Sequence, residues 1–131
     1  FTSILNYVKT GIPLLGFGGT GVGIASTEVQ NQTPAGTMLG VIDGATTGGQ
    51  VTSLSGYTIP NPLTSVLVKY TWRGDTNLSG NVNGSDYALA DTGFSGGGAG
   101  WYYGDVNYDG TINGSDYALI DTGFSSQNTI L

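Results

Sequence analysis

Residues 74–95 read G-D-T-N-L-S-G-N-V-N-G-S-D-Y-A-L-A-D-T-G-F-S, and residues 104–125 read G-D-V-N-Y-D-G-T-I-N-G-S-D-Y-A-L-I-D-T-G-F-S. The two stretches are identical at 16 of 22 positions and lie at a constant offset of 30 residues. A segment that recurs at a fixed period predicts one structural unit that occurs twice. The repeat therefore decides the fold of the second half of the chain and carries nearly all of its interpretable chemistry.

Each copy begins with a loop whose oxygen-bearing side chains fall at positions 1, 3, 5, 9 and 12, counted from its first aspartate. Position 6 is glycine, which permits the sharp turn of a calcium loop, and position 7 of such a loop binds through its backbone carbonyl. The pattern predicts two EF-hand-type loops and two Ca2+ per chain. The alternative is a pair of metal-free turns, but these do not require acids at both ends. The candidate metal ligands are Asp75, Asn77, Ser79, Asn81, Asn83 and Asp86 in the first loop and Asp105, Asn107, Asp109, Thr111, Asn113 and Asp116 in the second.

The two predicted sites differ in charge. Ser79 replaces an acid at position 5, so the first loop has two carboxylates and the second has three. Fewer charged ligands weaken a calcium site, and we expect the first loop to bind less tightly. Loops with so few carboxylates suit millimolar extracellular calcium better than the submicromolar cytosol.

Neither loop follows a long helix, because V-L-V-K-Y-T-W-R-G precedes Asp75 and W-Y-Y-G precedes Asp105. Each unit is expected to be a loop followed by one short helix, over residues 85–92 and 115–122, which Gly93 and Gly123 end. Val82 and Ile112 at position 8 are expected to join the loops by a short β-contact. A small shared core between the units is expected from Tyr87, Leu89, Phe94, Tyr117, Leu119 and Phe124.

Over residues 72–125 the chain resembles the type I dockerin repeats of secreted bacterial proteins, in which paired calcium loops are each followed by a single helix. The resemblance implies a calcium-stabilised fold and, for dockerins that act as adaptors, a cohesin-like scaffold as partner. The chain departs from the cohesin-binding pattern further along each helix. Asp91 and Asp121 stand where a basic residue is usual, and Ser85 and Ser115 follow a glycine where a Ser/Thr pair is usual.

Composition excludes several classes of function. The chain has 131 residues, no cysteine, no histidine and a net charge of −6, and its three basic residues are scattered, so a nucleic-acid interface is not expected. No stretch is long and apolar enough to span a membrane. Without His or Cys most nucleophile–base pairs are impossible, and we expect no enzyme activity. Seven of the nine acids lie in the repeats, so most of the negative charge belongs to the predicted calcium sites and their helices.

The first half of the chain reads as β. Strands are expected at residues 2–9, 36–43 and 64–72, with weaker candidates at 21–27 and 50–58 and glycine- or proline-rich turns between them. The apolar, glycine-rich residues 12–25 are expected to form a core hairpin or a strand in a neighbouring subunit. The predicted fold is α+β, mostly β. A small β-sandwich or curled sheet (residues 1–73) precedes a dockerin-like module (residues 74–131).

These observations favour a non-catalytic structural subunit of an extracellular or cell-surface assembly, bacterial and stabilised by calcium. A homo-oligomeric filament is expected, in which residues 1–9 add a strand to a neighbour's sheet. Two alternatives remain open at this point. One is an adaptor that docks onto a cohesin-like scaffold, and the other is a glycan-binding β domain with a dockerin-like tail.

Overall fold

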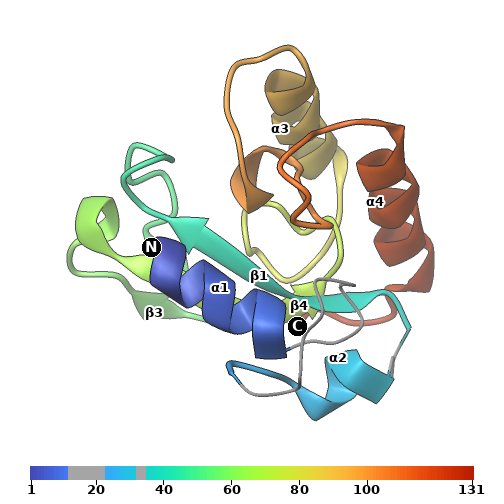
Figure 1. Cartoon of the computed structure of the whole chain (residues 1–131), viewed down its shortest axis with the longest axis horizontal. Coiled ribbons are helices and arrows are strands. Elements are labelled where there is room, and N and C mark those ends of the chain that lie inside the picture. The colour runs from blue at the N-terminus through green and yellow to red at the C-terminus, as the bar shows by residue number, and fades with distance from the viewer. Residues whose placement is uncertain (12–22, 32–34) are drawn as a thin grey trace.

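The computed structural model describes residues 1–11, 23–31 and 35–131, which form a mixture of helices and small antiparallel sheets (Figure 1). In chain order the elements are α1 (Thr2–Gly11), α2 (Thr27–Asn31), β1 (Thr37–Asp43), β2 (Ser53–Leu54), β3 (Tyr57–Thr58), η2 (Pro62–Thr64), β4 (Val66–Trp72), α3 (Gly84–Phe94), η3 (Trp101–Tyr103) and α4 (Gly114–Ser126). The predicted α+β mixture is confirmed, but helical residues outnumber extended ones, so "mostly β" is wrong. Within the described ranges, no helix has both the length and the apolar character needed to cross a membrane.

The antiparallel pair of β1 and β4 lies at the centre of the fold, and both strands were predicted. Met38 lies opposite Thr71 and Gly40 opposite Lys69, so these four residues share one face of the pair. β1 is buried on both faces. Burial alternates along most of β4, and its more buried face carries Leu67, Lys69 and Thr71.

The predicted β-sandwich is not present among the described residues, whose strands form two separate two-stranded sheets. The weak strand expected at residues 50–58 is instead the short hairpin of β2 and β3. The other weak strand, at residues 21–27, begins outside the described residues, and its last residue, Thr27, starts α2. Most of the hairpin expected at residues 12–25 also lies outside the described residues.

The N-terminal segment is a helix, so the prediction of a strand at residues 2–9 is wrong. Ile4, Leu5, Val8 and Gly11 are the positions that turn inward, and this spacing matches one face of a helix. Gly11 permits a close approach, because a Cβ there would lie 2.3 Å from the Ile24 carbonyl oxygen. The main-chain groups of α1 are bonded within the helix, so residues 1–9 do not offer the free strand edge that strand donation requires.

The helices of the repeats run further than predicted, to Phe94 in α3 and to Ser126 in α4. Gly93 and Gly123 therefore do not end them. Both glycines are buried where another segment passes close to the helix. A Cβ at Gly93 would lie 2.1 Å from the Tyr103 carbonyl oxygen, and one at Gly123 would lie 1.8 Å from that of Arg73. Each helix thus packs against the segment that leads into the loop of the other repeat.

Reciprocal contacts also join α3 to α4. The Tyr87 hydroxyl donates a hydrogen bond to Asp121, and the Tyr117 hydroxyl donates one to Asp91. The two tyrosine rings also meet phenylalanines of the opposite helix edge-on, with centroid distances of 6.3 and 6.2 Å. These aromatic contacts lie at the surface, because the phenylalanines are 51 and 63% exposed. The fully buried apolar side chains of the two helices are instead Ala90 and Ile120.

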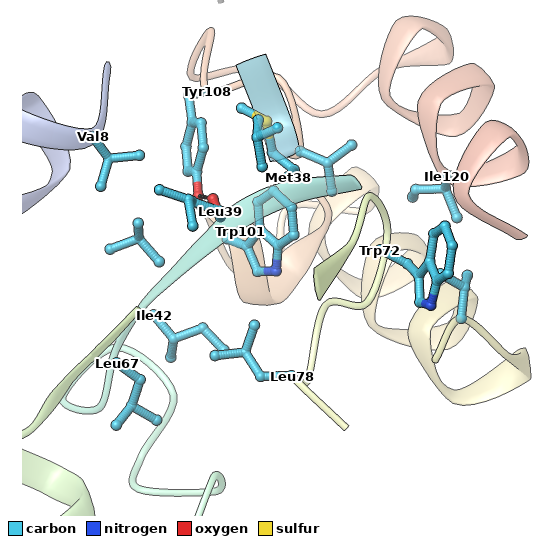
Figure 2. Packing of buried hydrophobic residues seen from close by; sticks show 14 of the residues in the cluster. Val8, Met38, Leu39, Ile42, Leu67, Trp72, Leu78, Trp101, Tyr108 and Ile120 are labelled. Atoms are coloured by element: carbon cyan, nitrogen blue, oxygen red, sulfur yellow. Dashed lines mark hydrogen bonds between the residues drawn. The ribbon is translucent and has the colours of Figure 1, made fainter. Parts of the chain in front are cut away.

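Buried apolar residues from both halves of the chain form one core (Figure 2). The Trp101 indole of η3 lies on β1 at Gly40, where a Cβ would come within 2.7 Å of it. Tyr108 stacks on Trp101 with a centroid distance of 5.5 Å, and its hydroxyl donates a 2.6 Å hydrogen bond to the Leu39 carbonyl. Residues of the second predicted calcium loop therefore belong to the packing around the central sheet.

Candidate metal sites

The first loop, residues 75–86, connects β4 to α3, and the second, residues 105–116, connects η3 to α4. Each loop ends inside the first turn of its helix. Asn83 and Asn113 accept a hydrogen bond from the backbone two residues on and cap their helices. Asp86 and Asp116 complete the capping box by accepting from the backbone amide of those asparagines. Positions 9 and 12 of each loop are thus fixed by helix formation.

The position-12 aspartates also reach back to the start of their loops. Asp86 Oδ1 accepts hydrogen bonds from the amides of Thr76 and Asn77, at 2.9 and 3.3 Å. Asp116 Oδ1 accepts equivalent bonds from Val106 and Asn107, at 3.1 and 3.4 Å. In both repeats these bonds bring the two ends of the loop together.

The position-1 aspartate of the first loop is surrounded by donors. Asp75 Oδ2 accepts from the Thr71 hydroxyl and the Gly80 amide, and Oδ1 accepts from the amide and hydroxyl of Ser79. Asp75 is fully buried, and burial raises its pKa while these hydrogen bonds and the nearby Lys69 oppose the rise. Hydrogen bonds from the protein itself therefore satisfy the Asp75 carboxylate.

The position-1 aspartate of the second loop has far fewer partners. Asp105 Oδ2 accepts one hydrogen bond, from the Gly110 amide at 3.1 Å. Its Oδ1 atom is buried and has no hydrogen-bond partner in the protein. Burial, followed by repulsion from Asp116, raises the pKa of Asp105 to about 6. A buried carboxylate oxygen without a donor, next to a second carboxylate, is an environment that favours a bound cation.

The remaining candidate ligands lie at the outer side of the loops. Ser79 and Asp109 at position 5 are exposed, as is Thr111, whereas Asn77, Asn81, Asn107 and Asn113 are partly exposed. Both carboxylate oxygens of Asp109 accept local hydrogen bonds, from Asn107 Nδ2 and from the Thr111 amide, each at 2.8 Å. Across residues 1–11, 23–31 and 35–131, no three Asp, Glu, His or Cys side chains are grouped closely enough to hold a metal ion. A calcium ion held by Asp105 and Asp116 would gain a third carboxylate if Asp109 turned toward it, with amide and carbonyl oxygens as the remaining ligands.

Position 4 of each loop has a role that the metal-ligand pattern does not reveal. Leu78 and Tyr108 occupy it, with left-handed backbone φ values of 60° and 62°, and both are 2% exposed. Few non-glycine residues adopt this conformation. Here it turns the position-4 side chain into the core, while the neighbouring polar side chains face the loop. In the sequence, this role is indicated only by the large apolar or aromatic residue that stands at position 4 of both loops.

The C-terminal residues cover the first loop. Gln127 donates to the Val82 carbonyl at 2.9 Å and accepts from the Val82 amide at 2.8 Å, so its side-chain amide pairs as a neighbouring strand would. Further along, the Trp72 indole donates to the Thr129 carbonyl, and the Leu131 amide donates to the Gly80 carbonyl. The backbone of Val82 is thus paired with Gln127 and not with Ile112, which corrects the predicted β-contact. We refer to residues 127–131 as the C-terminal clasp.

Comparisons with known proteins found no family model, curated protein or solved structure that matches this chain.

Proposed function

We propose that this chain is a non-catalytic structural protein whose fold calcium stabilises through its two loop–helix units. The supporting observation is the position of the second loop within the core. Tyr108 of that loop stacks on Trp101 and bonds to Leu39 of the central sheet. An ion held by Asp105 and Asp116 would therefore stabilise the packing of both halves and not a separate appendage.

Calcium fits the second loop on chemical grounds. The loop offers only oxygen donors, and hard cations such as calcium bind through oxygen. Bound calcium would supply positive charge beside the unpartnered Asp105 Oδ1 and would offset its repulsion from Asp116. Because the site uses few carboxylates, we place the protein at the bacterial cell surface or outside the cell, where calcium is millimolar.

We further propose that the chain assembles with copies of itself. Large apolar side chains are exposed at several points, and their burial between copies would contribute to association. Contacts between copies would use these folded surfaces, because α1 occupies the segment from which strand exchange was expected. Among the described residues, the large apolar side chains that are more than half exposed are Tyr7, Tyr57, Leu63, Phe94, Phe124 and Ile130.

Two measurements test this function. Native mass spectrometry counts the bound ions, and light scattering with and without a calcium chelator measures particle size. We expect bound calcium at about 1 mM free ion, the range of extracellular modules. We also expect particles larger than one chain in calcium and loss of those particles in chelator. A chain that binds no calcium, or that stays monomeric at high concentration in calcium, would contradict the proposal.

The adaptor function is a second candidate, favoured by the paired surface of α3 and α4. The two helices expose equivalent residues, including Phe94 and Phe124, and make reciprocal contacts. Ser85 and Ser115 are exposed at their first turns. A monomer that binds a cohesin-like scaffold, and loses that binding on substitution of both serines, would favour the adaptor over self-assembly.

A further inference from the structure

The two loops differ in how many protein donors hold their end aspartates. Asp75 and Asp86 together accept eight hydrogen bonds. Asp105 and Asp116 together accept four. An ionised carboxylate has about four lone-pair sites, so the four bonds to Asp75 fill its capacity. The second loop keeps unused acceptor capacity at Asp105.

Three hydroxyl groups account for most of this difference. Thr71 and Thr76 each donate a side-chain hydrogen bond to an end aspartate of the first loop. The Ser79 hydroxyl lies 3.3 Å from Asp75 Oδ1 and 3.1 Å from Asn81 Oδ1, and it shares its single proton between them. The residues 30 positions later are Trp101, Val106 and Asp109, none of which carries an aliphatic hydroxyl. Ser79 adds its backbone amide to Asp75, whereas the Asp109 amide goes to Asn107. We call Thr71, Thr76 and Ser79 the hydroxyl set.

A buried lysine adds positive charge beside the same loop. Lys69 on β4 is 8% exposed, and its ammonium donates a 3.0 Å hydrogen bond to the Leu78 carbonyl inside the loop. Its charge is close enough to Asp75 for the two to interact. The equivalent residue before the second loop is Ala99, which has no charge. The first loop therefore has a cation that is hydrogen-bonded inside the loop, whereas the cation that acts on Asp105 is Lys9 of α1, outside the second repeat.

We propose that the hydroxyl set and Lys69 replace calcium in the first loop, which closes without an ion, whereas the second loop requires calcium to close. This inference rests on the proposed calcium binding and restricts the tightly bound ion to the second repeat. The chain would then bind one ion tightly, and an ion at the first loop would have to displace donors that already satisfy Asp75.

Ion counting by native mass spectrometry with two matched variants tests the assignment. At about 1 mM free calcium we expect one ion in the wild type, one ion in Asp75→Asn and none in Asp105→Asn. Two ions of similar affinity in the wild type would overturn this inference but leave the proposed function intact. An ion lost in Asp75→Asn and kept in Asp105→Asn would reverse the assignment. No ion in the wild type would overturn the proposed function and, with it, the metal requirement of the second loop.

Hydrogen exchange of the wild-type chain gives a second readout that does not depend on any variant folding. The position-6 amides report on the two loops, because Gly80 donates to Asp75 and Gly110 donates to Asp105. Gly80 is also buried under the C-terminal clasp and Gly110 is exposed, so the response of each amide to calcium is the main readout. In chelator we expect Gly80 to exchange more slowly than Gly110 by at least about tenfold, and calcium to protect mainly Gly110. Equal exchange of both amides in chelator would overturn the inference.

A gain-of-function variant completes the test. Thr71→Val, Thr76→Val and Ser79→Asp together remove the hydroxyl set and give positions 2 and 5 of the first loop the side-chain types of the second. We expect this variant to bind a second ion and its Gly80 amide to become calcium-dependent. If the folded variant still binds one ion and keeps Gly80 protected in chelator, the hydroxyl set is not what replaces the metal.

Discussion

Single glycines in α3 and α4 mark the closest contacts between the repeats, and their substitution gives a sharp test of the packing. Gly123→Ala would place a Cβ 1.8 Å from the Arg73 carbonyl oxygen, so we expect a loss of at least about 1–3 kcal/mol in the free energy of unfolding. The matched control is Gly114→Ala in the same helix, where a Cβ would meet nothing within 4 Å. Alanine's higher helix propensity predicts a change there of less than about 1 kcal/mol.

Urea unfolding of both variants in saturating calcium makes the comparison. Equal stabilities would show that α4 can move away from Arg73 at little cost, which would contradict the close approach described above.

At the residue scale, spacing alone identified the candidate ligands, because a calcium loop requires oxygen at fixed positions. It did not identify Thr71 or Lys69, which lie on β4 before the loop and reach it only once the strand is paired. It also assigned Gly93 and Gly123 to helix ends, because a sequence does not show which segment passes over a glycine. Tertiary contacts determine both features.

At the level of elements, Tyr87 of α3 and Tyr117 of α4, each bonded to an aspartate of the opposite helix, are predicted to titrate at unusually high pH. Burial, then the hydrogen bond and charge of Asp121, raise the pKa of Tyr87 from 10.0 to about 12, and Asp91 acts in the same way on Tyr117. A raised folded-state pKa means that these pairs stabilise the fold below pH 10 and that this stabilisation is lost as pH rises toward 12.

Ultraviolet titration of the tyrosines tests this arrangement. Asp121→Asn should lower the pKa of Tyr87 toward its ordinary value and leave that of Tyr117 unchanged. The Asp91→Asn variant should have the opposite selectivity. A shift of both tyrosines in either variant would show that the pairs are not independent.

The C-terminal clasp is a second element whose contribution can be measured. Gln127→Glu keeps an acceptor for the Val82 amide but removes the donor to its carbonyl and places negative charge there. We expect a loss of about 1–3 kcal/mol and faster exchange of the Val82 amide. Asn128→Asp introduces the same charge at an exposed neighbour and should change stability by less than about 0.5 kcal/mol. Equal losses of stability in the two variants would show that the added negative charge, and not the lost hydrogen bond to Val82, causes the effect.

Among the elements, α1 shows most clearly why the sequence alone does not determine the secondary structure of a short segment. Residues 2–9 are rich in β-branched and aromatic side chains, which favour a strand. The positions of Ile4, Leu5, Val8 and Gly11 match a helical face equally well. A short segment allows both interpretations, and packing of Val8 in the core and of Gly11 against Ile24 decides between them.

For the whole molecule, one continuous core predicts that removal of the proposed calcium ion would act on both halves together. Because the second loop contributes Tyr108 to the packing on β1, loss of the ion should lower the stability of the central sheet as well. Thermal unfolding in chelator should remain a single transition, at a lower temperature than in calcium. Far-ultraviolet and near-ultraviolet circular dichroism should report the same midpoint. Two separated transitions would show that the repeats and the sheet unfold independently.

The C-terminal clasp also has a consequence for the order in which the chain is completed during synthesis. Gln127 and Thr129 reach back across 45 and 57 residues to Val82 and Trp72. On the ribosome, the first loop is therefore made long before the residues that cover it. We expect its backbone groups to remain open to water until residues 127–131 have been translated. A chain that stops after Ser126 represents that unfinished stage, and hydrogen exchange should find the Val82 amide unprotected in it. Native protection of Val82 in the shortened chain would contradict this late completion.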